Sequence, residues 1–390
     1  MTRRALCAAA LAAVVAAAGC GGDDEGRKAP DGALNVYVSV PTHGPAAANG
    51  RAVAAGARLA LRDAGGRAGG RRVRLIELPS NRPGDQDWDP GTVEANAKRA
   101  ADDPRSIAYV GEVDRGASAV SVPRTNAADL LQVAPADGLT SLTRSPRGRP
   151  RAGPERYYPG EHRTFLRLVP SDARVGRQMV ALARTGGGRR IALVDTPDFA
   201  PRELGAVLDA QVRRDGVPVA HTVLKDDPDG VAEEVRELAL TRPDAVLVSG
   251  EPGPVARALL AELARRLPSA TVVASPALAA TAGEGSGAVA VTGVLPASAQ
   301  PRLGRRALER LGPRGRPDAL YGYDAMTAVL RGVRAGGGDR RAVARAALRP
   351  GAERGTTGAY QVVRGGDVVR PRVALVPLDG GPVRIRPLGP

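Results

Sequence analysis

Residues 34–66 read LNVYVSVPTHGPAAANGRAVAAGARLALRDAGG, a β-branched run followed by a short loop and a long Ala-rich segment. The run at 34–40 is bounded by Pro41 and predicts a strand. Ala57, Leu61 and Ala64 recur at helical spacing and predict a helix over 46–64, which Gly65 and the next glycine end. A strand followed by an amphipathic helix is the repeating unit of an α/β fold.

The same unit recurs along the rest of the chain and predicts two series of strands and helices. Two such series indicate two doubly wound lobes, each with a parallel sheet covered on both faces. The first series has strands at 73–78, 107–110 and 131–134 and helices at 92–102 and 117–129. After a basic, Pro- and Gly-rich loop at 144–162, strands at 165–169, 191–194, 217–223, 245–249 and 271–274 alternate with helices at 172–185, 201–214, 228–241 and 252–266. A strand at 289–295, helices at 318–335 and 339–348, and a hairpin of 358–363 with 368–376 complete the chain.

The N-terminus carries an export signal. Arg3 and Arg4 precede an apolar run at 5–18, which is too short to span a bilayer as a stable helix. The run ends in Ala-Ala-Gly-Cys20, which resembles the lipobox of bacterial lipoproteins, although Ala17 stands where Leu is usual. We expect a signal peptide at 1–19 and a lipidated tether at 20–33, with Cys20 as the acylated residue. An ordinary cleaved signal with an incidental cysteine is the alternative.

Composition argues against several classes of protein. The chain has 390 residues and a net charge of +15, but its arginines are scattered and aromatic residues are only 3%. This pattern does not predict nucleic-acid binding, whereas an anionic ligand or membrane surface stays open. The sequence has no Walker A loop, zinc-protease motif or nucleophile elbow, so we expect no enzyme, no catalytic residue, no cofactor and no metal. An export signal occupies the place where a transcription regulator would carry its DNA-binding helices.

Several stretches together resemble the type I periplasmic binding proteins, in the branch that serves branched-chain amino-acid ABC transporters. No one of them is specific alone, but their order along the chain is. They are 36–50, 56–66, 69–75, the stretch 165–172 that is similar to the crossing into the second lobe, 243–250, 321–326 and the final hairpin.

The resemblance implies two lobes joined by a three-crossing hinge, with the solute held between them. It places lobe 1 at 34–164 plus 296–357 and lobe 2 at 165–295 plus 358–390. The implied protein is an extracytoplasmic, lipid-anchored monomer that captures a small polar or amino-acid-like solute and delivers it to an ABC permease in the membrane. A ligand-binding sensor or recognition module of the same fold, without transport, is the alternative.

Candidate ligand residues in lobe 1 lie in loops after predicted strands. Thr42, His43 and Asn49 follow the first strand, where they serve equally well as turn or helix-cap residues. By resemblance, Asp114 and Arg115 stand where the family presents serines to an amino-acid carboxylate. Arg115 offers a bidentate clamp for a carboxylate, or a surface pair with its neighbour.

The remaining candidates continue the same comparison. Ala136 and Asp137 replace part of a Pro-Ser-Ala-Thr type loop, which disfavours leucine-like solutes. In lobe 2, Phe199 is one of only 2 phenylalanines and is expected to cover the apolar part of a solute. Glu251 follows the strand 245–249 and is expected to bind a ligand ammonium, with a helix-capping carboxylate as the alternative.

Overall fold

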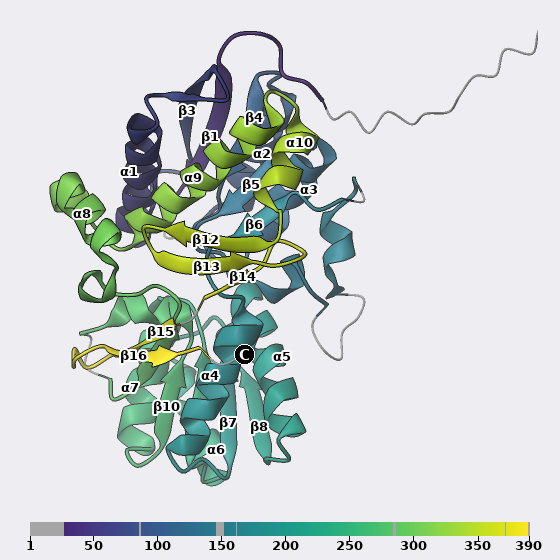
Figure 1. Ribbon diagram of the computed structural model, residues 1–390. Helices are drawn as coiled ribbons and strands as arrows, with labels where there is room; N and C mark the ends of the chain where they lie inside the picture. Colours follow the sequence, from purple (N-terminus) through teal and green to yellow (C-terminus); the bar gives the residue numbers. More distant parts are fainter. Residues whose placement is uncertain are drawn as a thin grey trace, which may run out of the picture.

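The computed structural model describes residues 27–85, 87–145, 152–160, 162–283, 286–370 and 372–388. The predicted signal peptide, Cys20 and most of the tether lie outside these residues. The described chain forms two α/β lobes, one above the other in Figure 1, and confirms the predicted fold class.

The first lobe is built on a sheet in the order β2-β3-β1-β4-β5-β6, parallel except for the short β2. Alternation along β1 divides its side chains between two cores: Val36 and Val38 face the core that contains α9, whereas Tyr37 packs in a second core that contains Ala100 of α2. The strands are β1 (Leu34–Val40), β2 (Arg67–Ala68), β3 (Arg71–Pro79), β4 (Ser106–Val110), β5 (Leu131–Ala134) and β6 (Phe165–Arg167). The helices are α1 (Ala47–Asp63), α2 (Pro90–Asp102), α3 (Ser118–Ala127), α8 (Arg302–Leu311), α9 (Asp318–Gly336) and α10 (Arg340–Ala347).

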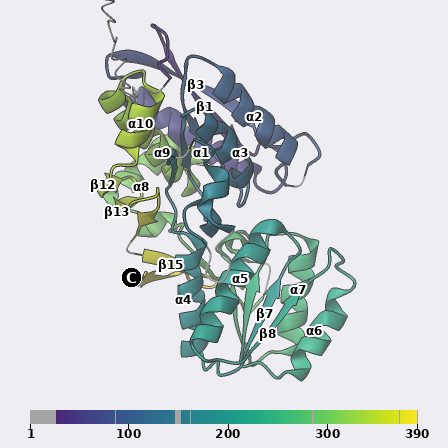
Figure 2. The same cartoon turned by 90° about the vertical axis from the view of Figure 1, so that its right-hand side faces the viewer.

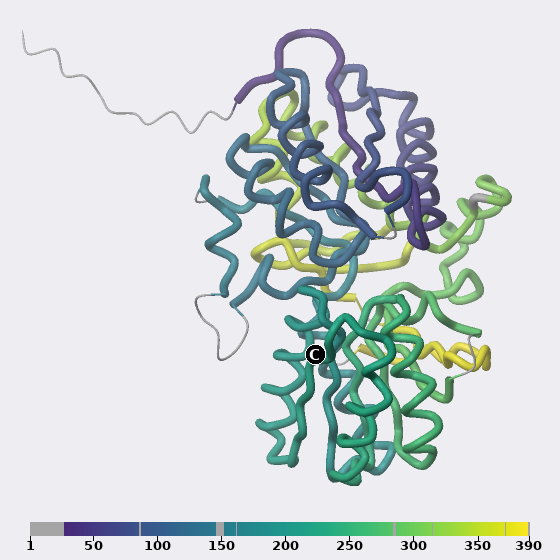
Figure 3. Tube along the Cα trace, turned by 180° about the vertical axis from the view of Figure 1, so that it is seen from behind, coloured from purple at the N-terminus to yellow at the C-terminus, as the bar shows by residue number. Residues whose placement is uncertain are grey.

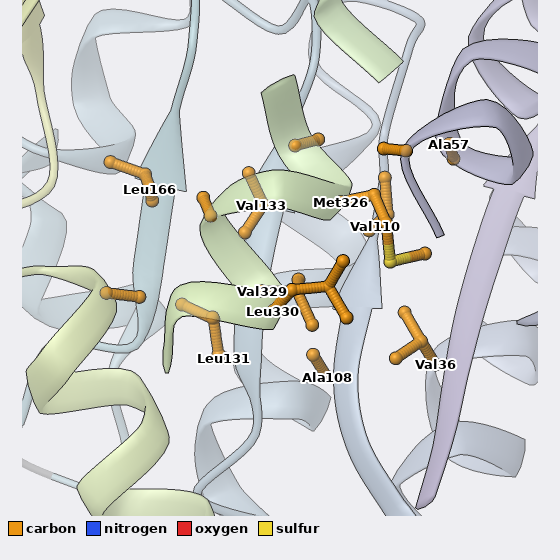
Figure 4. Packing of buried hydrophobic residues seen from close by; sticks show 14 of the residues in the cluster. Val36, Ala57, Ala108, Val110, Leu131, Val133, Leu166, Met326, Val329 and Leu330 are labelled. Carbon is orange, nitrogen blue, oxygen red and sulfur yellow. The ribbon is translucent and has the colours of Figure 1, made fainter. Parts of the chain in front are cut away.

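The core of this lobe consists of small aliphatic side chains, as the low aromatic content requires. Figure 4 shows Met326, Val329 and Leu330 of α9 lying over the strands, against Val110 and Val133. The chain returns to lobe 1 after most of lobe 2, and α9 belongs to this returning segment. In Figure 3 the segment is the green part of the tube that lies among purple and blue parts.

The second lobe has the sheet order β16-β15-β11-β10-β9-β7-β8. Its central strands are parallel, and α4 and α5 pack on one face while α6 and α7 pack on the other (Figure 2). The strands are β7 (Ile191–Asp195), β8 (Val219–Val223), β9 (Ala245–Ser249), β10 (Thr271–Ala274), β11 (Val289–Thr292), β15 (Arg372–Pro377) and β16 (Arg384–Pro387). The helices are α4 (Asp172–Thr185), α5 (Phe199–Arg214), α6 (Val231–Leu240) and α7 (Pro254–Arg266).

Two expected lobe boundaries differ from the structure. β6, which was expected to begin lobe 2, pairs with β5 as the edge strand of the first sheet. The expected hairpin strand at 368–376 is divided: β14 (Val368–Val369) pairs with β13 (Gly358–Val362), whereas β15 pairs with β11 in lobe 2. A third sheet of β12 (Gly351–Gly355), β13 and β14 packs on lobe 1, because Tyr360 and Val362 enter its core.

The chain therefore passes between the lobes after β6, after β11 and after β14. Arg370, which is buried at the third passage, ties the crossings together. Its Nε donates to the carbonyl oxygen of Leu168 at the first passage, and its guanidinium lies 5.3 Å from the ring centroid of Tyr321. The Tyr321 hydroxyl in turn donates to the carbonyl oxygen of Gly293, at the second passage (2.8 Å).

Candidate functional site

A cavity of about 1030 Å³ lies between the lobes. Its walls come from loops at the carboxyl ends of β1, β3, β4, β5 and β6 in lobe 1, and of β7, β8, β9, β10 and β11 in lobe 2. Parallel sheets place all these ends at one edge, where ligands of open α/β folds bind. The volume suits a small-molecule ligand.

Most of the predicted ligand residues line this cavity. Asn49, Asp114, Arg115 and Ala136 contribute from lobe 1, and Phe199 and Glu251 contribute from lobe 2. Asn49 also accepts a hydrogen bond from Arg316 (3.2 Å), whose side chain lines the same cavity.

Three predicted residues lie outside the cavity wall. The backbone N–H groups of Thr42 and His43 both donate to Oδ1 of Asn81, and these hydrogen bonds fix the loop after β1 to the loop after β3. Asp137 is fully buried, and its carboxylate accepts hydrogen bonds from the backbone N–H groups of Gly116, Ser118 and Leu139. These residues shape the loops rather than line the cavity, because backbone N–H groups at loop and helix starts require acceptors.

Arg115 crosses from one lobe to the other. From the loop after β4, its Nη2 donates to Asp172 at the start of α4 (2.6 Å), and its Nη1 donates to Glu251 after β9 (3.1 Å). The side chains of Arg115 and Asp172 are 8% and 3% exposed, so solvent screens this pair poorly. The sequence predicts that Glu251 binds a ligand ammonium. In the structure, the Glu251 carboxylate accepts a hydrogen bond from the guanidinium of Arg115.

Carboxylates dominate the cavity. Desolvation, together with the charges of Asp87, Glu112 and Asp137, raises the pKa of Asp114 to about 8. Desolvation also raises the pKa of Glu251 to about 8, because Asp87, Asp198 and Asp172 oppose the favourable charge of Arg115. Among the described residues, the wall holds seven carboxylates and three guanidiniums: Asp87, Asp114, Asp172, Asp198, Asp226, Glu251 and Asp318, against Arg115, Arg257 and Arg316.

Among the wall residues that the sequence interpretation missed are Asp87 and Trp88. Both lie in the loop between β3 and α2, and both line the cavity. A signal was present, because Trp88 is the one tryptophan of the chain and follows a predicted strand with no hydrophobic periodicity around it. A large aromatic residue in such a loop is a better candidate for a ligand contact than for the core.

Phe199 lies where the two lobes touch. It begins α5 and is 50% exposed. Its ring faces the loop after β4 so closely that a Cβ atom added to Gly116 would lie 3.4 Å from Phe199 Cδ1. Gly116 also has a φ of 86°, which favours glycine. A side chain at Gly116 would therefore disturb both the loop and the contact between the lobes.

A buried carboxyl group, that of Glu112, lies at the start of the loop that carries Asp114 and Arg115. Glu112 is fully buried, and the Tyr109 hydroxyl donates to its Oε1 (2.7 Å). Burial raises the pKa of Glu112 to about 7. This carboxyl adds negative potential behind the cavity wall when it is ionised.

Comparison with known proteins identifies the architecture. The fold matches a leucine-binding protein from Thermotoga maritima (TM-score 0.72, 20% identity, 90% of this chain and 97% of that chain). It also matches an ABC-transporter solute-binding protein from R. palustris in complex with benzoate (0.71, 19%, 92% and 96%). A third match is a substrate-binding protein from Desulfitobacterium hafniense in complex with Leu (0.71, 17%, 91% and 100%).

Among curated protein sequences, none matches this chain. No helix within the described residues is both long and apolar enough to cross a membrane. A family model described as "Periplasmic binding protein" matches residues 34–381, nearly the whole described chain. The chain therefore belongs to the periplasmic binding protein family, whose members bind solutes outside the cytoplasm.

Proposed function

We propose that this protein is the solute receptor of an ABC importer, which captures a small polar or amino-acid-like solute and delivers it to a permease. The observation that carries the proposal is the cavity of about 1030 Å³ whose wall is shared by strand-end loops of both lobes. A solute bound there touches both lobes at once. Its binding energy therefore favours the closed arrangement, which is the form that a permease can recognise.

The hinge is suited to such a movement. In the part of the chain that the structure describes, three segments pass between the lobes, and Arg370 links them at one place, directly and through Tyr321. Motion concentrated in a few residues at the ends of elements is typical of hinge closure. The three main cores each belong to one lobe, whereas a smaller buried cluster joins Ala200 of α5 to residues of lobe 1 such as Phe165. Closure therefore does not require the main cores to be repacked.

Two of the similar proteins bind leucine and benzoate, and these two solutes give the starting panel for this chain. Leucine is expected to bind poorly, because the loops after β4 and β5 present Asp114 and Ala136 at the cavity wall. A carboxylate facing a ligand carboxylate repels it, and alanine offers no side-chain hydrogen bond. We expect a polar or zwitterionic solute instead.

The test is a thermal-shift screen of amino acids, amides, amines and small carboxylates, followed by calorimetry on the hits. A bound solute raises the melting temperature by mass action. Small-angle scattering with the best hit should then show a smaller radius of gyration. If no small solute in a broad panel stabilises the protein, the receptor proposal fails.

Attachment to the membrane through acylated Cys20 completes the proposal, with a monomeric receptor on a tether of polar residues. A tether keeps the receptor close to the permease and raises its effective concentration there.

A further inference from the structure

The sign of the charge in the cavity is opposite to that of the protein. The chain has a net charge of +15, yet the cavity wall holds seven carboxylates and three guanidiniums among the described residues. A surface biased towards arginine does not produce such a wall by itself. The excess of acidic groups in the wall of a basic protein indicates that the cavity is built to be negative. A negative potential attracts a cationic solute and repels an anionic one.

The guanidiniums do not neutralise all of these carboxylates. Arg115 is shared by Asp172 and Glu251, and Arg316 donates to Asn49. Within the described parts of the chain, Asp87, Asp114 and Asp198 form no ion pair. The charges that act on Asp114 are those of other carboxylates, and they raise its pKa together with desolvation. Desolvation and the charge of Asp198 likewise raise the pKa of Asp87.

These three carboxylates come from both lobes. Asp87 and Asp114 belong to lobe 1, whereas Asp198 precedes α5 in lobe 2. Carboxyl groups that face one another resist ionisation, and a cation placed between them stabilises their ionised forms and so draws the two walls together. No group of three ligating side chains among the described residues lies close enough together to hold a metal ion. The spread of the carboxylates fits an extended organic cation better.

Two further features of the wall fit the same ligand. Trp88 and Phe199 line the cavity beside these carboxylates, and aromatic faces attract ammonium and guanidinium groups. Arg115 is more than nine-tenths buried and lines the cavity, and its Nε has no hydrogen-bond partner among the described residues. A buried N–H group without a partner is costly, so an acceptor oxygen on the solute is expected to meet it.

We infer that the solute carries a positively charged amine or guanidinium, held among Asp87, Asp114 and Asp198 next to Trp88, and an acceptor group that meets Arg115. This inference rests on the proposed function, because it specifies which class of solute the receptor captures. A basic amino acid has both the cationic group and the acceptor group.

Calorimetry on the purified protein with L-arginine, L-lysine, agmatine, L-leucine and benzoate tests the assignment. L-arginine or L-lysine should bind more tightly than leucine or benzoate, and salt should weaken the binding. Agmatine lacks the carboxylate, so it should keep the cation contact and lose the one to Arg115. Because Trp88 is the single tryptophan, its fluorescence should change when the cation binds.

Variants separate this site from a general effect of charge. D114N and D198N should each lower the affinity for the basic amino acid by about tenfold or more, since each removes a charged contact. Trp88→Leu should lower it about fivefold through loss of the aromatic face. Glu309→Gln, on the exposed surface of α8 and outside the cavity wall, should change nothing.

The outcomes distinguish the two proposals. Tight binding of leucine or benzoate without any binding of the cations overturns the cationic assignment and leaves the receptor function standing. Cation binding that D114N, D198N and Trp88→Leu all leave unchanged also overturns it. Failure of every solute in the broad panel to bind rejects both.

Discussion

Nη1 of Arg115 lies 3.1 Å from Oε1 of Glu251, and this contact joins a loop of lobe 1 to a loop of lobe 2 across the cavity. The same guanidinium reaches Asp172 at 2.6 Å. One arginine therefore connects the two lobes. A cationic solute held among Asp87, Asp114 and Asp198 would add a second link between the lobes.

Replacing Arg115 by alanine should destabilise the protein by about 3–5 kcal/mol, because it leaves the buried carboxylate of Asp172 without a partner. Urea denaturation measures this change. The matched control is Arg124→Ala, which removes an exposed ion pair with Glu94 and should cost less than about 1 kcal/mol. If the two variants lower the free energy of unfolding equally, the buried contact of Arg115 stabilises the protein no more than an exposed ion pair does.

Gly56→Ala should separate α1 from α9. A Cβ atom at Gly56 would lie 1.7 Å from the carbonyl oxygen of Ala319, so the helices must move apart. Overpacking of this kind costs about 1–3 kcal/mol. Gly351→Ala is the control, since nothing lies within 4 Å of its added Cβ atom. Thermal unfolding should show a lower melting temperature for Gly56→Ala alone, and wild-type stability of that variant contradicts the close approach.

Stability should fall as the pH rises from about 5 to about 8. Burial raises the pKa of Glu112 to about 7 and that of Asp114 to about 8, both well above the values of an unfolded chain. In this window the native state binds more protons than the unfolded state, so the free energy of unfolding decreases with pH. Carboxyls with a lowered pKa, such as Glu262 at about 2, act in the opposite direction only at lower pH.

Denaturation curves measured at several pH values check this dependence. Glu112→Gln removes one of the titrating groups and should flatten the slope between pH 5 and pH 8. The same slope in the wild type and in this variant would exclude Glu112 as a source of the effect.

Replacing Cys20 by alanine should release the protein from the membrane fraction, because acyl chains supply the anchoring energy and two or more of them are needed for stable attachment. Cell fractionation and immunoblotting measure the distribution. Conversion of the adjacent Gly21 to alanine keeps the thiol and serves as the control. An unchanged distribution in the cysteine variant rejects the lipobox interpretation.

The sequence alone determined the fold class, because hydrophobic periodicity reflects which face of each element is buried. The segments 172–185 and 245–249 coincide with α4 and β9 as the structure has them. Local patterns did not reveal α8 (Arg302–Leu311), because this helix is rich in arginine and buries few side chains. They also did not show that 368–376 is divided between two sheets, since both halves have the same strand-forming composition.

The cavity, too, has features that the sequence predicts and features that only the tertiary structure decides. Resemblance to the family's loops, together with position after a strand, pointed to Asp114, Arg115, Phe199 and Glu251, since strand ends gather at one edge of each sheet. The partnership of Arg115 with Asp172 and Glu251 was decided only by the tertiary structure, because these residues are 57 and 136 positions apart in the chain. Which carboxylates keep a countercharge depends on distances between lobes, and those distances are fixed by the packing of separate cores at a shared hinge.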